Sequence, residues 1–168
     1  YDLIVRNTTE TFAKFLPNLK LSDKELKAFF GPTLEESFSW YEKDPKKVTA
    51  MIKYYRERNR VNHETNGPKA FNNAALALKT LKEHGYVLGV ASSKKSEFVE
   101  LGLKQNDLLQ YIDVVIGSDD VTKHKPDAEP LLKALAHLGV SKENAVYVGD
   151  HANDIIAARN AGMKSIGV

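Results

Sequence analysis

The chain has 168 residues, 42% of them hydrophobic and 27% charged, which suits one folded core with a small appended domain and excludes a disordered protein. Its 24 Lys and Arg residues are interspersed with 22 Asp and Glu residues, so the sequence has no basic stripe for nucleic acid. Cysteine is absent and no apolar run approaches the roughly 20 residues of a membrane span, so we expect a soluble, cytoplasmic protein without disulfides or a membrane partner.

Residues 2–62 have the pattern of helices and contain no convincing strand. Apolar side chains recur there at helical spacing: Leu3, Phe12, Phe15 and Leu16, and then Leu26, Phe29 and Phe30. Three sites carry residues that begin helices: Ser22 with Glu25 and Thr33 with Glu36, which both fit the capping box, and Asp44 with Pro45. We therefore predict about four helices in this half of the chain.

The segment HETNGPK at residues 63–69 separates this helical half from the rest of the chain. Its Asn, Gly and Pro residues break both helical and strand periodicity. We therefore predict a domain boundary there, with a helical domain at residues 1–66 and a second domain at residues 67–168.

Beyond the boundary, short apolar runs alternate with helical segments. The runs are rich in Val and Ile and occupy residues 86–91, 112–117, 144–149 and 164–168. The helical segments lie near residues 72–84, from about residue 95, and at 128–138 and 152–161. Such alternation is typical of parallel strands that are buried on both faces, so we predict an α/β fold with a Rossmann-like parallel sheet.

Polar residues that suit phosphate chemistry follow the predicted strands, where ligands of open parallel sheets bind. Ser92 and Ser93 follow the first run, Asp150 follows the third with Asp154 one helical turn on, and Lys125 lies between them. A hydroxyl can donate to a phosphoryl oxygen, an ammonium can neutralise its charge, and carboxylates supply hard oxygens for Mg²⁺. We therefore predict a phosphate site at Ser92, or its neighbour Ser93, with Lys125, and a ligand for Mg²⁺ at Asp150, with Asp154 as the second acid of the pair.

Each of these residues also has a simpler structural interpretation. Ser92 or Ser93 is able to cap the following helix, Asp150 is able to cap the next one, and a lysine before proline is usually solvated surface. Those interpretations do not explain why Lys125 and the acidic pair share one edge of the sheet. His151, beside Asp150, is open to contact with a leaving group, but helix packing is its default role.

Three segments resemble motifs of the haloacid dehalogenase (HAD) superfamily, in the same order along the chain. YVLGVASSKK at residues 86–95 and KHKPDAEPLL at residues 123–132 resemble the second and third motifs. VYVGDHANDIIAARNAGM at residues 146–163 resembles the fourth motif and is the most specific of the three. The first half, including GPTLEESF at residues 31–38, resembles the small helical cap of the phosphoglycolate-phosphatase-like branch, and within that branch it is most similar to bacterial pyrophosphatases.

The resemblance implies an HAD core with a small helical cap. It implies a Mg²⁺-dependent phosphatase of small phosphorylated metabolites of the phosphoglycolate kind, or of pyrophosphate. It gives catalytic roles to Lys125 and to Ser92, with Ser93 as the neighbouring alternative for the phosphate hydroxyl. It also implies that Asp150 binds magnesium and that Asp154 supports the metal and the lysine.

The nucleophile that the resemblance implies is not among these residues. It belongs to an Asp-x-Asp-Gly-Thr motif, which we expect upstream of Tyr1 at the end of the first strand of the core. We therefore expect that first strand to be missing from the 168 residues, and we expect these residues alone to be inactive and to fold poorly.

Two other functions are compatible with the sequence. A phosphomutase would transfer the aspartyl phosphate to a sugar hydroxyl rather than to water. A non-catalytic fragment would bind phosphate or a partner without transferring a phosphoryl group. We expect a small phosphorylated substrate or pyrophosphate as the partner, and either a monomer or a homodimer.

Overall fold

The computed structural model describes the chain from Asp2 to Val168, and the side chains of these residues except Asp2, His63, Glu64 and Asn66. The chain divides into two compact units, residues 1–68 and residues 69–168, and each is described by itself. The sequence prediction places the boundary two residues earlier, between residues 66 and 67.

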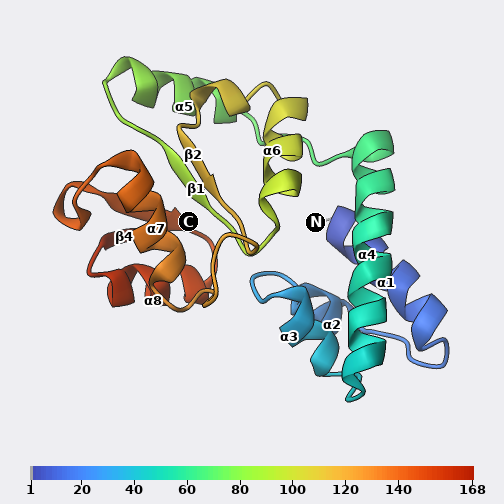
Figure 1. Ribbon diagram of the computed structural model, residues 1–168. Coiled ribbons are helices and arrows are strands. Elements are labelled where there is room, and N and C mark those ends of the chain that lie inside the picture. Colours follow the sequence, from blue (N-terminus) through green and yellow to red (C-terminus); the bar gives the residue numbers. More distant parts are fainter. Residues whose placement is uncertain (1) are drawn as a thin grey trace. The chain divides into compact units, whose positions relative to one another are not determined.

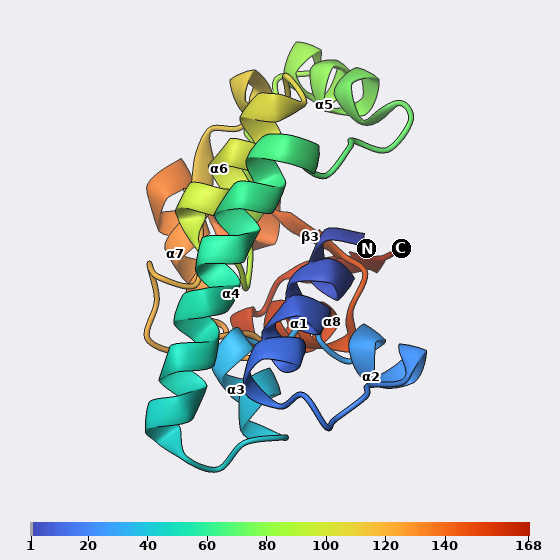
Figure 2. The same ribbon diagram turned by 90° about the vertical axis from the view of Figure 1, so that its right-hand side faces the viewer.

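The first unit is built from helices (Figure 1). The described helices are α1 (Asp2–Phe15), α2 (Asp23–Lys27), α3 (Leu34–Ser39) and α4 (Pro45–Asn66), which confirms the predicted all-helical pattern. Figure 2 shows α1 lying alongside the longer α4, and the two helices pack against each other.

The predicted helix starts are present, with one difference. Ser22 forms a complete capping box, because its hydroxyl accepts from the Glu25 amide and Glu25 accepts from the Ser22 amide at 2.8 Å. Asp44 accepts from the Lys46 amide at 3.0 Å and precedes the proline that begins α4. At Thr33 the described bond is the forward one, from the Glu36 amide at 3.3 Å, so Thr33 acts as a simple N-cap.

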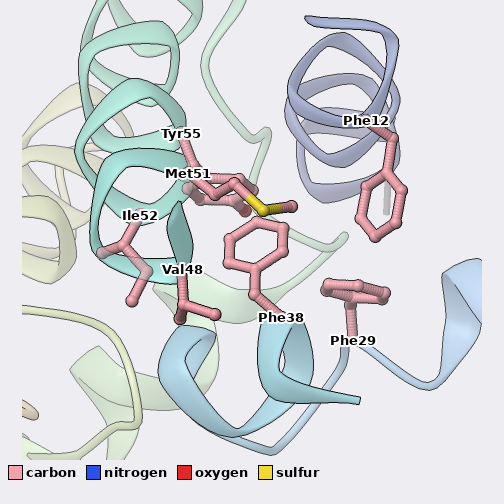
Figure 3. Close-up of a cluster of buried hydrophobic side chains, with 7 residues drawn as sticks. All are labelled: Phe12, Phe29, Phe38, Val48, Met51, Ile52 and Tyr55. Atoms are coloured by element: carbon pink, nitrogen blue, oxygen red, sulfur yellow. The ribbon is translucent and has the colours of Figure 1, made fainter. Parts of the chain in front are cut away.

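The core of the first unit is aromatic and lies between α1, α3 and α4 (Figure 3). Its buried members are Phe12, Phe29, Phe38, Val48, Met51, Ile52 and Tyr55. Phe12 packs against Phe29 edge to face, with ring centroids 5.9 Å apart, and Phe29 packs against Phe38 at 5.6 Å in the same manner. Four aromatic side chains and three aliphatic ones therefore form the buried core of this unit together.

A row of buried amides also joins α1 to α4. Asn7 donates to Asn59 at 2.8 Å, and Asn62 donates to Asn7 at 2.6 Å. All three side chains are buried, so each bond replaces one that the amide would make with water. Because an amide left unpaired there would be costly, this row fixes the register of the two helices.

The second unit alternates helices and parallel strands, as predicted. Its described elements are α5 (Ala74–Glu83), β1 (Gly89–Ala91), α6 (Ser96–Gln105), β2 (Val114–Ile116), α7 (Glu129–Leu138), β3 (Val146–Gly149), α8 (Ala152–Ala161) and β4 (Lys164–Gly167), with short 3-10 turns at Leu109–Tyr111 and Lys142–Asn144. The first strand is shorter than the predicted run at residues 86–91. Tyr86 and Val87 lie outside it, and both are exposed.

The strands form two parallel pairs. β1 pairs with β2 in the register Val90 to Val115, and β3 pairs with β4 in the register Val148 to Ile166. Within the described residues the two pairs are separate two-stranded sheets and not one continuous sheet. Parallel strands joined through helices confirm the predicted α/β class.

Burial of the strands differs from the prediction. The helices α7 and α8 cover one face, where Leu131, Ala157, Ala158 and Ala161 form a core against which Ala91 and Tyr147 pack. The alternate side chains of β3 and β4 are about half exposed, at 48% for Val146, 53% for Val148 and 50% for Ile166. The expectation of burial on both faces is therefore wrong for this strand pair in the described structure, since helices cover only one of its faces.

No helix in the described part of the chain is both long and apolar enough to cross a membrane.

Candidate functional site

Lys125 is held at the carboxyl ends of β1 and β3. Its ammonium nitrogen lies 2.7 Å from Asp154 Oδ1, 3.1 Å from the Ala91 carbonyl oxygen and 3.1 Å from the Tyr147 hydroxyl. An ammonium has three N–H donors, so each of them has an acceptor. The Lys125 and Asp154 side chains are 11% and 9% exposed, which makes this a nearly buried ion pair.

Asp154 is positioned by the first turn of α8. Its Oδ2 accepts from the His151 amide at 3.1 Å, while His151 Nδ1 accepts from the Asn153 amide at 3.1 Å. His151 is thus the N-cap of α8, and it forms a capping box with Asp154. The structure therefore gives His151 the capping role that the simpler interpretation of the sequence assigned to Asp150.

A glycine allows the Asp154 carboxylate to lie against the end of β3. A Cβ atom at Gly149 would be 2.4 Å from Asp154 Cβ and 2.7 Å from Asp154 Oδ2. Non-bonded atoms do not approach so closely, so any larger residue at position 149 must displace the carboxylate that holds Lys125.

Ser92 and Ser93 follow β1 and are half-buried. The Ser92 amide donates to the Ile116 carbonyl at 2.9 Å, and the Ser92 hydroxyl accepts from the Lys94 amide at 3.2 Å. The residue at the N-cap position of α6 is Lys95, so neither serine caps that helix. The Ala91 carbonyl accepts from the Lys125 ammonium, and Ser92 is the next residue. The Ser92 hydroxyl therefore lies on the same segment as the carbonyl that holds Lys125.

Asp150 lies on the loop directly after β3 and is exposed. Among the described side chains, no group of three or more His, Asp or Glu residues lies together in a way that could hold a metal ion. Magnesium is commonly held by one or two carboxylates, with water and substrate phosphates completing its octahedron. Asp150 fits that donor chemistry, as does Oδ2 of Asp154, which accepts from the His151 amide and keeps a second lone pair. Oδ1 of Asp154 already faces Lys125 and the Tyr147 hydroxyl.

Tyr147 is the member of this site that sequence reasoning missed. Its hydroxyl donates to the Ala91 carbonyl at 3.0 Å and lies 3.3 Å from Asp154 Oδ1, in addition to its contact with Lys125. The available signal was its position in β3, between two valines that face the other side of the strand. From the sequence alone, a tyrosine at that position is equally well explained as part of the hydrophobic core.

Contacts within the site shift the pKa values of Asp154 and Lys125 further than burial shifts them in the opposite direction. Burial by itself raises the pKa of Asp154, but the hydrogen bond and charge of Lys125 bring that pKa below its ordinary value. Burial likewise lowers the pKa of Lys125, while the contacts with Asp154 and Tyr147 raise it above its ordinary value. Burial raises the pKa of the Tyr147 phenol. The site therefore holds an ammonium, a carboxylate and a neutral phenol at neutral pH.

We expect acid to remove the stabilisation that Asp154 provides. Because its folded-state pKa lies below the unfolded value of about 3.9, its ionisation stabilises the fold above that pH, and the contribution disappears as the pH falls through the folded-state pKa. The difference in free energy of unfolding between wild type and Asp154→Asn should be largest near neutral pH and should shrink below about pH 4. Urea denaturation of the full-length protein at a series of pH values measures this difference, and a constant difference contradicts the prediction.

A second acidic pair, Asp119 and Asp120, has a structural role. Asp119 accepts from the Ser96 amide at 2.9 Å, and Asp120 accepts from the Gly117 amide at 2.8 Å. The Asp119 bond attaches the loop after β2 to the start of α6, and the Asp120 bond closes that loop on itself. Gly117 permits the close approach, because a Cβ there would lie 2.2 Å from the Ser96 nitrogen.

The second unit is a parallel α/β fold in which a nearly buried lysine–carboxylate pair lies beside the strand ends. The family model described as haloacid dehalogenase-like hydrolase matches residues 1–168, and the chain belongs to that family. The family resemblance inferred from the three motifs is therefore confirmed.

Named relatives lie within the same family. The chain is 42% identical over 167 residues to the PpaX protein of Clostridium perfringens (strain 13 / Type A), covering 99% of this chain and 76% of that protein. It is 35% identical over 167 residues to pyrophosphatase PpaX of Bacillus cereus (strain AH820), with the same coverage of 99% and 76%. A haloacid dehalogenase-like hydrolase from Bacteroides fragilis has a similar crystal structure, with a TM-score of 0.91, 28% identity, and coverage of 99% of this chain and 79% of that one.

Proposed function

We propose that the protein is a Mg²⁺-dependent phosphohydrolase that releases phosphate from pyrophosphate or from a small phosphate monoester. The observation that carries this proposal is the Lys125 ammonium, which is fixed at 2.7 Å from Asp154 and bonded to the residue before Ser92. A fixed cation beside a hydroxyl-bearing loop stabilises the negative charge of a phosphoryl group. Support for pyrophosphate comes from the similarity to PpaX proteins, which are named as pyrophosphatases.

Each residue of the site has a separate task in this proposal. The Ser92 hydroxyl, or that of Ser93, donates to a phosphoryl oxygen, and Lys125 neutralises charge on the same group. Asp154 keeps the ammonium in place, while Asp150 supplies the carboxylate for Mg²⁺. The bound metal reduces the charge repulsion between the phosphoryl group and an attacking carboxylate.

The attacking group in this proposal is an aspartate that precedes Tyr1. It attacks phosphorus to give an aspartyl phosphate, which water then hydrolyses. The described Ser92 hydroxyl has the Lys94 amide, and no basic side chain, as its hydrogen-bond partner, so we do not propose it as a nucleophile. In this proposal the helical unit corresponds to the small cap domain that the family resemblance implies.

Phosphate release by the full-length protein tests the proposed function. Pyrophosphate, phosphoglycolate and an aryl phosphate are compared with and without Mg²⁺, and the 168-residue chain is assayed beside the full-length protein. Release from at least one substrate, dependent on Mg²⁺ and absent from the shorter chain, is the expected result. An isomerised sugar phosphate in place of free phosphate would identify a mutase, and binding without release would identify a non-catalytic module.

We expect Asp150→Asn to lower kcat by about a hundredfold, because an amide oxygen is a weaker ligand for a hard cation than a carboxylate. The loss should be partly recovered as the Mg²⁺ concentration rises. The exposed Asp23, in the first turn of α2, provides a control, since Asp23→Asn removes the same charge in the other unit. Full activity in Asp150→Asn would exclude the assigned metal role.

A further inference from the structure

We propose that Tyr147 is a positioning residue whose hydroxyl holds the Lys125 ammonium against the end of β1. The inference rests on the proposed function, in which Lys125 acts on the phosphoryl group. Tyr147 itself acts through Lys125 and is not assigned a contact with substrate.

The phenol oxygen lies where three segments of the unit meet. It is 3.1 Å from Lys125 Nζ, 3.0 Å from the Ala91 carbonyl and 3.3 Å from Asp154 Oδ1. A phenol has one proton, so it accepts from the ammonium and donates to the carbonyl or to the carboxylate. The Lys125 nitrogen lies 5.7 Å from the centroid of the Tyr147 ring, so its short contact is with the hydroxyl and not with the ring face.

Packing explains the ring of Tyr147 but does not require its hydroxyl. The ring packs against the core formed by Leu131, Ala157, Ala158 and Ala161, and phenylalanine would fill the same space. The hydroxyl satisfies the third N–H of Lys125, which otherwise has Asp154 and the Ala91 carbonyl. Removing it leaves one N–H of a nearly buried ammonium without its acceptor.

The hydroxyl also connects the two strand pairs. Tyr147 lies on β3 and bonds to the last residue of β1, directly before Ser92. The phenol therefore couples the position of the ammonium to the position of the serine segment that is proposed to bind the same phosphoryl group.

Tyr147→Phe in the full-length protein tests this inference. Loss of one hydrogen bond to a charged group predicts a fall in kcat of about tenfold or more. KM should stay within about twofold of the wild-type value, because the phenol is proposed to act through Lys125 and not on the substrate itself. The melting temperature should change little, because the ring remains. Tyr86→Phe removes a hydroxyl from an exposed tyrosine of the same unit and should leave kcat unchanged.

A double-mutant cycle separates positioning from a general structural effect. If the phenol acts through Lys125, Tyr147→Phe has no further effect on kcat in a Lys125→Met background. An equal loss in both backgrounds would overturn the inference. Incorporation of 3-fluorotyrosine at position 147 keeps the ring and the hydroxyl but weakens the oxygen as an acceptor, so it should give a smaller change in the same direction.

A spectroscopic measurement keeps this inference distinct from the proposed function. In protein labelled with ¹⁵N-lysine, the ammonium signal of Lys125, identified by its loss in Lys125→Met, should be sharp in wild type and broadened by exchange in Tyr147→Phe. A signal that stays equally sharp overturns the inference. If the wild-type protein releases no phosphate from any substrate, the proposed function fails, and the NMR comparison alone still decides whether Tyr147 holds the ammonium.

Discussion

Replacing Lys125 by methionine is expected to lower kcat for phosphate release by about a thousandfold, because it removes the fixed positive charge from the phosphate site. The ammonium is held by three acceptors, one of them Asp154 at 2.7 Å, so its charge has a fixed position. Lys123→Met is the matched control. Lys123 is two residues away with a side chain that is 72% exposed, and its removal should leave kcat nearly unchanged.

The same substitution should destabilise the protein. Lys125→Met leaves the Asp154 carboxylate nearly buried without its partner, a change that typically costs about 3–5 kcal/mol. Urea denaturation of the full-length protein measures this loss. The double variant Lys125→Met with Asp154→Leu removes both charges, so it should recover stability but not activity. Recovery of activity in that double variant, or wild-type kcat in Lys125→Met, would contradict the role assigned to the lysine.

Gly149→Ala is expected to lower the free energy of unfolding by about 3 kcal/mol and to reduce kcat, because the new methyl group collides with the residue that holds Lys125. The collision is severe, since the added Cβ would lie 2.4 Å from Asp154 Cβ and 2.7 Å from its Cγ. Asp154 Cβ is fixed to the backbone of α8, so it cannot move away as the end of a flexible side chain can. Relief of the overlap must therefore displace the strand end, the helix or both.

Gly167 offers a control in the neighbouring strand. It is the partner of Gly149 in the register of β3 with β4, and a Cβ there would meet Ile155 Cδ1 at 3.8 Å, an ordinary contact. Gly167→Ala should therefore leave stability within about 0.5 kcal/mol of wild type. If Gly149→Ala and Gly167→Ala cost the same, the loss arises from the change of glycine to alanine in a strand, and the proposed collision is refuted.

The helices were predictable from local signals, and the strands less so. Ser22 and Asp44 begin their helices as predicted, because an N-cap depends on residues within one turn of each other. The predicted run at residues 86–91 is reduced to Gly89–Ala91. The extent of a strand depends on pairing with its partner, here β2, which lies some 25 residues further along the chain and is not visible to a local pattern. The exposure of Val146 and Val148 was likewise beyond a local pattern, because apolar character does not say which faces other elements cover.

At the candidate site, the sequence by itself determined which chemical groups stand at the carboxyl ends of the strands. The order of strands and helices predicts that four candidate residues lie beyond the strand ends, where ligands of parallel sheets bind. They are Ser92, Lys125, Asp150 and Asp154. Only the tertiary structure decided how they are joined: it pairs Lys125 with Asp154, makes His151 and not Asp150 the cap of α8, and adds Tyr147 as a third acceptor. The contacts of Lys125 and Tyr147 join residues 7 to 56 positions apart, so they are set by packing of the strands against α7 and α8 and not by any local pattern. The cap at His151 is local, and there the backbone at the start of α8 selects His151 over Asp150.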